Sequence, residues 1–412
     1  MNKLILSLSL LLFANLLFSQ KKELSVSGFV TDSKTGEALL GSNILLYKDS
    51  LDINGNPLRG TASNNFGFYV LPNLSPARYI IVFRHIGYKP VLIDSTLDDK
   101  NAMHRINVAL QPEEIQLEEV VVQGKKENKA GVSIVEMPPD IVNRLPSLSG
   151  EVDLLKSLEY IPGVKSASEI SSGLYIRGGS PDQTLTLVDG MIFYNPAHLG
   201  NFTTTFNSSA LQEIKLLKGA FPAEYGGRLS GVLDLKLRSG TKERDVESVG
   251  IGTLNSNLTL EGPMDSNSTY MLAGRGMYYD ILQKNFIKDS EIPRYHFYDL
   301  NCKFSYTISG SDIVSISVLY SKDRLYNPPA DEDIRYDINW ENGGLNINWF
   351  EANSSSFISN TIVSYINYKF GSSVENNFSV TNSSDYFTLS KLQDFLLKKS
   401  FEFYLYEKHS IK

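Results

Sequence analysis

The stretch that decides the fold runs from residue 173 to residue 240 and reads GLYIRGGSPDQTLTLVDGMIFYNPAHLGNFTTTFNSSALQEIKLLKGAFPAEYGGRLSGVLDLKLRSG. Short apolar runs alternate here with glycine pairs and turn dipeptides, which is typical of short strands joined by tight loops. The apolar runs are Leu174–Ile176, Leu185–Val188, Ile214–Leu217 and Val232–Leu237. We therefore predict several short strands in this region.

In that order, the motifs IRGG, LVDG, NP, LQEIKLLKG and AEYGGRLSGVLD resemble the plug domain of TonB-dependent outer-membrane receptors. The resemblance implies an α+β plug over residues 134–240 that fills the lumen of a β-barrel and helps to bind ligand. It also implies that Arg177, Glu224 and Arg228 contact the barrel wall, since a guanidinium binds carboxylates with bidentate geometry. The alternative for both arginines is a simple surface position.

Three further features of the plug region are read from local patterns. Ser149 to Glu151 could open a helix, which Pro162-Gly163 would stop. We expect Asp189-Gly190 to be only a turn and His198 to be an ordinary loop histidine.

Upstream, residues 21–111 show strand-like runs with turn signals every ten or so residues, which favours a small β-sandwich. Three segments of this region resemble the carboxypeptidase-regulatory-like domain: GFVTDSKTGEALLGSNILL, NNFGFYVLPNL and YIIVFRHIGYKP. The name of that domain does not imply peptidase activity. Asp52, Asn54 and Asn56 have calcium-loop spacing, but Pro57 stands where such a loop needs a sharply turning glycine, so we expect a solvated loop.

Between the sandwich and the plug, the linker 112–133 holds the segment Glu119, Val120, Val121 and Val122 within a polar context. An unpaired, β-favouring segment can add as a strand to a partner's sheet edge. The segment resembles the TonB box, which implies the periplasmic domain of TonB as a partner. The alternative is the last strand of the sandwich.

The N-terminus places Lys3 before an apolar run that is short for a membrane span, followed by Ser19 and charged residues. This layout predicts a secretory signal peptide over residues 1–20, with a membrane anchor as the alternative. Elsewhere no apolar stretch approaches the ~20 residues of a transmembrane helix, so a membrane-spanning form of this chain must use a barrel.

Residues 241–412 show longer alternating segments. Apolar positions such as Leu300, Cys302 and Phe304 alternate with polar ones such as Asn301 and Lys303. A lipid-facing barrel wall has this pattern, although a soluble sandwich alternates as well. We expect Ser321–Asn339 to be a long external loop.

The length of residues 241–412 limits how many barrel strands this region can form. Plugged transporters have barrels of roughly 22 strands, at about 10 residues per strand. Residues 241–412 are too few for this, so we expect only the first strands of an antiparallel transmembrane β-barrel and an N-terminal portion of a receptor.

The predicted fold class is thus mostly β: a small sandwich, an α+β plug and partial barrel strands. The net charge of −7 argues against nucleic-acid binding, and a single cysteine rules out an internal disulfide. Metalloprotease, nucleophile-elbow and phosphate-loop motifs are missing from the sequence, so no enzyme activity, metal or cofactor is predicted.

The resemblance implies a cell outer-membrane receptor, embedded in outer-membrane lipid, that takes up a scarce ligand: a siderophore, peptide, cobalamin or glycan. The alternative is a non-enzymatic surface adhesion or glycan-binding protein that uses the sandwich.

Overall fold

The structure is a computed structural model. It describes residues 24–48, 57–64, 66–98, 103–113, 134–142, 153–166, 173–198, 203–252, 255–286, 293–309, 312–327, 334–354, 357–376, 384–406 and 409–411. Four of our predictions lie outside these residues: the signal peptide, the Asp52–Asn56 loop, the TonB-box-like segment and the helix start at Ser149–Glu151. Within the described part of the chain, no helix combines the length and apolar character needed to cross a membrane.

The N-terminal domain is the predicted β-sandwich. Its strands are β1 Leu24–Asp32, β2 Asn43–Lys48, β3 Arg59–Ala62, β4 Phe68–Leu74, β5 Ala77–Arg84, β6 Val91–Leu97, β7 Met103–Arg105 and β8 Val108–Leu110. One sheet has the order β4-β1-β7, with β8 also pairing with β1, and the other has the order β3-β2-β5-β6. Alternate residues of both sheets share one core that includes Val26, Ile44 and Phe83, as expected for two packed sheets.

The plug region follows. Its elements are β9 Ile134–Met137, α2 Pro139–Val142, α3 Leu154–Ser157, η1 Leu158–Tyr160, β10 Val164–Ser166, β11 Leu174–Ile176, η2 Pro181–Gln183, β12 Thr184–Val188, β13 Met191–Ile192, η4 Ser208–Ala210, β14 Leu211–Leu217 and β15 Gly231–Leu237. A mixed sheet has the order β13-β12-β15-β14-β9, and β10 pairs with β11. All four predicted apolar runs are strands.

The predicted helix start at Ser149–Glu151 lies outside the described residues, and the described helix α3 begins at Leu154. Asp153 is its N-cap, and the Asp153 carboxylate accepts a hydrogen bond from the Lys156 amide at 3.2 Å. Such a cap satisfies an amide that has no partner within the helix. Leu154, Leu155 and Leu158 are buried in the plug core, and the chain turns at Pro162-Gly163 as predicted.

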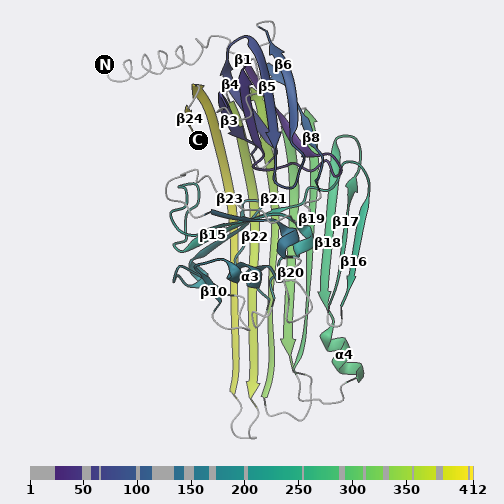
Figure 1. Cartoon of the computed structure of the whole chain (residues 1–412). Coiled ribbons are helices and arrows are strands. Elements are labelled where there is room, and N and C mark those ends of the chain that lie inside the picture. Colours follow the sequence, from purple (N-terminus) through teal and green to yellow (C-terminus); the bar gives the residue numbers. More distant parts are fainter. Residues whose placement is uncertain are drawn as a thin grey trace, which may run out of the picture. The chain divides into compact units, whose positions relative to one another are not determined.

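The third part of the chain is a nine-stranded sheet with the order β16 to β24, which we call the wall sheet (Figure 1). Its elements are β16 Val246–Ile251, β17 Asn255–Pro263, β18 Ser268–Met277, α4 Tyr279–Phe286, β19 Arg294–Ser309, β20 Asp312–Tyr326, β21 Ile334–Ser354, β22 Phe357–Asn376, β23 Ser384–Tyr406 and β24 His409–Ile411. Neighbouring strands from β16 to β20 are antiparallel. The predicted antiparallel, barrel-like architecture is confirmed.

The two faces of the wall sheet differ as the alternation predicted. Leu300 and Val318 belong to the exposed face, with relative exposures of 38% and 37%, whereas Asn301, Lys303 and Ser317 are buried on the other face. Lys303 is the cross-strand partner of Ser317. The buried polar face is the one that packs against the plug.

The expected long loop over Ser321–Asn339 is wrong in its extent. Strand β20 continues to Tyr326, and β21 begins at Ile334. Polar residues here pair across the strands, as Arg324 does with Asp337 at 2.7 Å. Ion pairs of this kind stabilise neighbouring strands without apolar side chains. A search for alternating apolar residues therefore does not detect these strand ends.

Candidate functional site

The plug and the wall sheet meet through buried charged groups from both sides. Asp189, in the turn after β12, is the first of these. Lys303 of β19 approaches its carboxylate at 3.2 Å, and the Ser317 hydroxyl of β20 donates to it at 2.7 Å. Asn346 of β21 donates to the Asp189 carbonyl at 3.1 Å. One plug residue therefore contacts three consecutive wall strands.

Local geometry prepares Asp189 for this role. Its φ of 51° lies in the left-handed region, which Asp tolerates better than most residues. The Leu237 amide also donates to the Asp189 carboxylate at 3.2 Å, and Lys303 donates to the Leu237 carbonyl at 3.0 Å. Burial alone would raise the pKa of Asp189, but the nearby Lys303 ammonium, with further lysine charge and hydrogen bonds, holds that pKa below its usual value.

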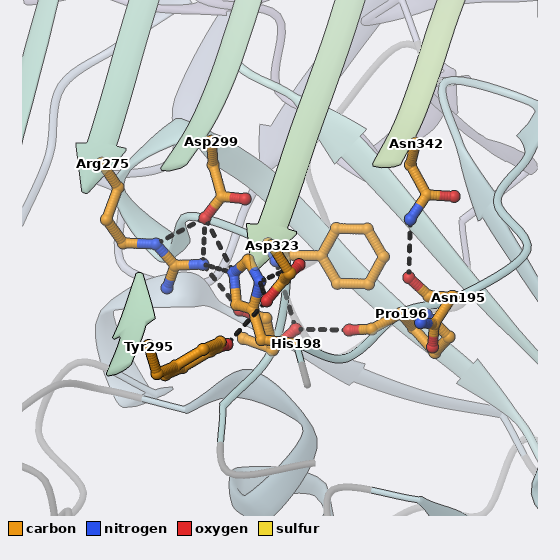
Figure 2. Close-up of polar contacts among 10 residues, drawn as sticks. Asn195, Pro196, His198, Arg275, Tyr295, Asp299, Asp323 and Asn342 are labelled. Atoms are coloured by element: carbon orange, nitrogen blue, oxygen red, sulfur yellow. Dashed lines mark hydrogen bonds and ion pairs between the residues drawn. The ribbon is translucent and has the colours of Figure 1, made fainter. Parts of the chain in front are cut away.

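A second cluster surrounds His198 (Figure 2). Its Nδ1 lies 3.0 Å from both carboxylate oxygens of Asp323, and its Nε2 lies 3.0 Å from Oδ2 of Asp299. The side chains of all three residues are almost completely buried. A histidine whose two ring nitrogens both face carboxylates is held as the doubly protonated imidazolium.

Arg275 and Tyr295 complete this His198 cluster. Arg275 Nε donates to Asp299 Oδ2 at 2.8 Å, and its Nη2 lies 3.0 Å from His198 Nε2. The Tyr295 hydroxyl donates to Asp323 at 2.6 Å. Arg275 Nη2 and the protonated His198 Nε2 are both donors, and the Asp299 carboxylate that they share offsets their repulsion. Two cations and two carboxylates thus balance one another in a buried site.

The pKa of His198 reflects this balance. Burial alone would lower it, but the carboxylates of Asp299 and Asp323 outweigh burial and raise the pKa to about 9. The imidazolium is therefore the form present at neutral pH.

Smaller contacts extend the interface around the two clusters. The Tyr194 hydroxyl donates to Asp394 of β23 at 2.9 Å, and the Asn342 amide of β21 donates to the Asn195 carbonyl at 3.4 Å. Arg238 directly follows β15 of the mixed plug sheet (β13-β12-β15-β14-β9) and pairs with buried Glu261 of β17 at 2.7 Å. Polar contacts thus reach strands β17, β21 and β23, and apolar wall residues such as Met271 and Leu319 pack into the plug core beside them.

The residues predicted to contact the barrel wall, Arg177, Glu224 and Arg228, lie outside the two buried clusters around Asp189 and His198. Arg177 is exposed at its Gly-flanked turn, where its own amide donates to the Gly163 carbonyl. Arg228 donates to the neighbouring Gly227 carbonyl. Glu224 meets the wall through its carbonyl oxygen, 3.5 Å from Lys398 Nζ of β23. Among the described residues, the ion pairs between plug and wall do not include these two arginines.

Sequence reasoning instead missed Asp189 and His198, for which local patterns predict only a turn and a loop. Asp189 does lie in a turn, but both side chains are buried ion-pair partners. A usable signal was present in the wall strands. Asp299 and Lys303 fall on the polar side of the alternation, and a charge facing inward requires a partner.

The described residues contain no group of three or more His, Cys, Asp or Glu side chains that could hold a metal ion. The ion pairs of His198 and Arg275 with Asp299 and Asp323 make the His198 cluster a network built from the plug and the wall.

Comparisons with known proteins agree with this architecture. Residues 144–232 match the family model TonB-dependent Receptor Plug Domain, and residues 26–122 match CarboxypepD_reg-like domain. The TonB-dependent transporter Oar of Myxococcus xanthus is 23% identical over 241 residues, which are 57% of this chain and 22% of the relative.

Solved structures resemble the fold. The outer membrane transporter YddB of Escherichia coli has a TM-score of 0.50 at 12% identity, covering 66% of this chain and 45% of that chain. A mutant of the ferric enterobactin receptor PfeA of Pseudomonas aeruginosa has a TM-score of 0.46 at 14% identity, covering 66% and 46%. The chain thus spans about a fifth of its curated relative and about half of these structures. The chain is thus similar to TonB-dependent receptors in its plug domain and to a TonB-dependent transporter over 57% of its length.

Proposed function

We propose that this chain serves in TonB-dependent uptake of a scarce ligand across the outer membrane, with the plug as the movable element. The observation that carries the proposal is the plug domain, whose Asp189 and His198 are buried against the wall sheet. The charged part of this interface holds the plug in place through groups that water can solvate once they separate, whereas Met271, Leu319 and Ile366 of the wall add apolar packing. We infer a non-enzymatic role from the similarity to a TonB-dependent transporter.

The ligand stays open within the class of siderophore, peptide, cobalamin or glycan. The relatives take different ones: one solved neighbour is a ferric enterobactin receptor and another is a copper transporter. The alternative of surface adhesion gains no support from these relatives.

We assign TonB contact to Glu119–Val122, on sequence pattern alone. The match to the CarboxypepD_reg-like model extends to residue 122, so the alternative of a terminal strand of that domain still competes. Arg177 and Arg228 are retained as proposed barrel contacts, since both are cationic and lie in glycine-flanked turns of the plug.

Binding of the purified periplasmic domain of TonB to the full-length protein tests this assignment. Val121→Pro removes an amide that strand addition requires, whereas Val121→Ile keeps the amide and the β-branched side chain. We expect the proline variant to lose TonB binding and the isoleucine variant to retain it. Equal binding by both variants would refute the TonB assignment, and protease resistance of residues 119–122 would favour the terminal strand.

A further inference from the structure

The His198 cluster joins one plug side chain to a set of groups that all come from the wall. Arg275 comes from β18, Phe297 and Asp299 from β19, and Asp323 from β20. His198 is therefore the member that leaves if the plug moves, and the wall groups stay together on their strands.

The wall groups form a slot for a planar ring. Phe297 stacks on the His198 ring, with centroids 3.7 Å apart and an interplanar angle of 21°. Asp299 and Asp323 accept at opposite edges of that ring, each at 3.0 Å. The slot thus offers an aromatic face and two carboxylates to a flat group that donates at two edges.

Charge selects what this slot accepts. Without His198, the wall keeps the positive charge of Arg275 against the negative charges of Asp299 and Asp323, so it lacks one positive charge. Moreover, the Oδ1 atom of Asp299 is buried and has no hydrogen-bond partner among the described residues, which leaves unused acceptor capacity in the site. A neutral occupant would leave this charge uncompensated, which is costly in a buried site.

The Phe297 ring is suited to a cation. The guanidinium of Arg275 already lies 5.2 Å from the ring centroid, within the range of cation–π attraction. Imidazolium and guanidinium groups share the features that the slot uses: a flat shape, one positive charge and N–H donors at the edges.

We propose that Asp299, Asp323 and Phe297 form a cation-binding site on the wall, filled by His198 while the plug is in place. When the plug moves, an imidazolium or guanidinium group of the transported ligand takes the same site. This second part rests on the proposed transport function. His198 then acts as an internal occupant that a cationic ligand group replaces.

Chemical rescue of His198→Ala in the full-length protein tests the site. Imidazole is the probe, and pyrazole is the matched control because it has the same shape but is neutral at pH 7. We expect imidazole to bind the variant and raise its melting temperature with increasing concentration, and pyrazole to do neither. Wild-type protein should not respond, since His198 fills the site. Equal effects of both compounds on the variant, or none from imidazole, would overturn the proposal.

A double variant covers the case in which His198→Ala does not fold. Adding Asp323→Asn makes the wall neutral, so His198→Ala/Asp323→Asn should fold better than His198→Ala and bind imidazole about tenfold or more weakly, as expected for the loss of one charged acceptor. If the double variant is as unstable as the single one, the wall does not require a cation and the proposal fails. Neither experiment involves TonB or uptake, so its failure is distinct from failure of the proposed function.

Discussion

At the scale of single residues, His198 makes plug stability depend on pH. Its pKa is about 9 in the folded protein against 6.5 for an ordinary histidine. Because the folded pKa is raised, the stabilisation is complete below pH 6.5 and is lost as pH rises through about 9. The shift corresponds to on the order of 3 kcal/mol. Urea unfolding of the plug should show wild type and His198→Gln converging between these pH values, whereas parallel pH profiles would contradict the assignment.

Asp189 gives a second prediction at this scale. Asp189→Asn leaves the Lys303 ammonium buried without its carboxylate, which should destabilise the plug by about 3–5 kcal/mol. Glu136→Gln is the control, because the Glu136–Lys215 pair is 3.2 Å long but Glu136 is 59% exposed. Glu136→Gln should lower the free energy of unfolding by less than about 1 kcal/mol. The free energy of unfolding in urea measures both, and similar losses would show that burial of the Asp189 pair is unimportant.

At the scale of elements, the junction between the plug sheet and the wall sheet depends on Gly240. Its φ is 84°, and a Cβ there would lie 2.2 Å from the Tyr270 carbonyl oxygen of β18. Gly227 has a φ of 82° with no atom within 4 Å of its Cβ position, so it carries the same backbone strain without the clash.

We therefore expect Gly240→Ala to displace β15 from β18, and Gly227→Ala to cost only the ~1–2 kcal/mol of left-handed strain. Amide hydrogen exchange of β18 should rise in the first variant and stay near wild type in the second. Unchanged exchange in both would mean that the backbone relaxes around the added methyl group.

At the scale of the whole molecule, the proposed transport cycle links the linker to the plug. Deleting Glu119–Val122 should abolish uptake while ligand binding persists. Binding requires only the folded plug, whereas uptake requires TonB to pull on this segment and displace the plug. Uptake and binding assays on cells that express the full-length variant check this. Unchanged uptake would remove the segment from the mechanism, and joint loss of uptake and binding would point to misfolding.

The sequence by itself determined the order of the parts. Apolar runs and glycine turns located β11, β12, β14 and β15, and strict alternation around Leu300 assigned the two faces of β19. These features follow from local preferences and a period of two, which a linear pattern records directly.

Only the tertiary structure decided which charges meet. Asp189 and Lys303 are far apart in the chain, as are His198 and Asp323, and a linear pattern contains no information on which strands lie opposite a given turn. The arginines stood out because glycines flank them, whereas Asp189 and His198 acquire their role from burial. Burial between a folded plug and a folded wall makes an ordinary turn aspartate and a loop histidine into the charges that join them.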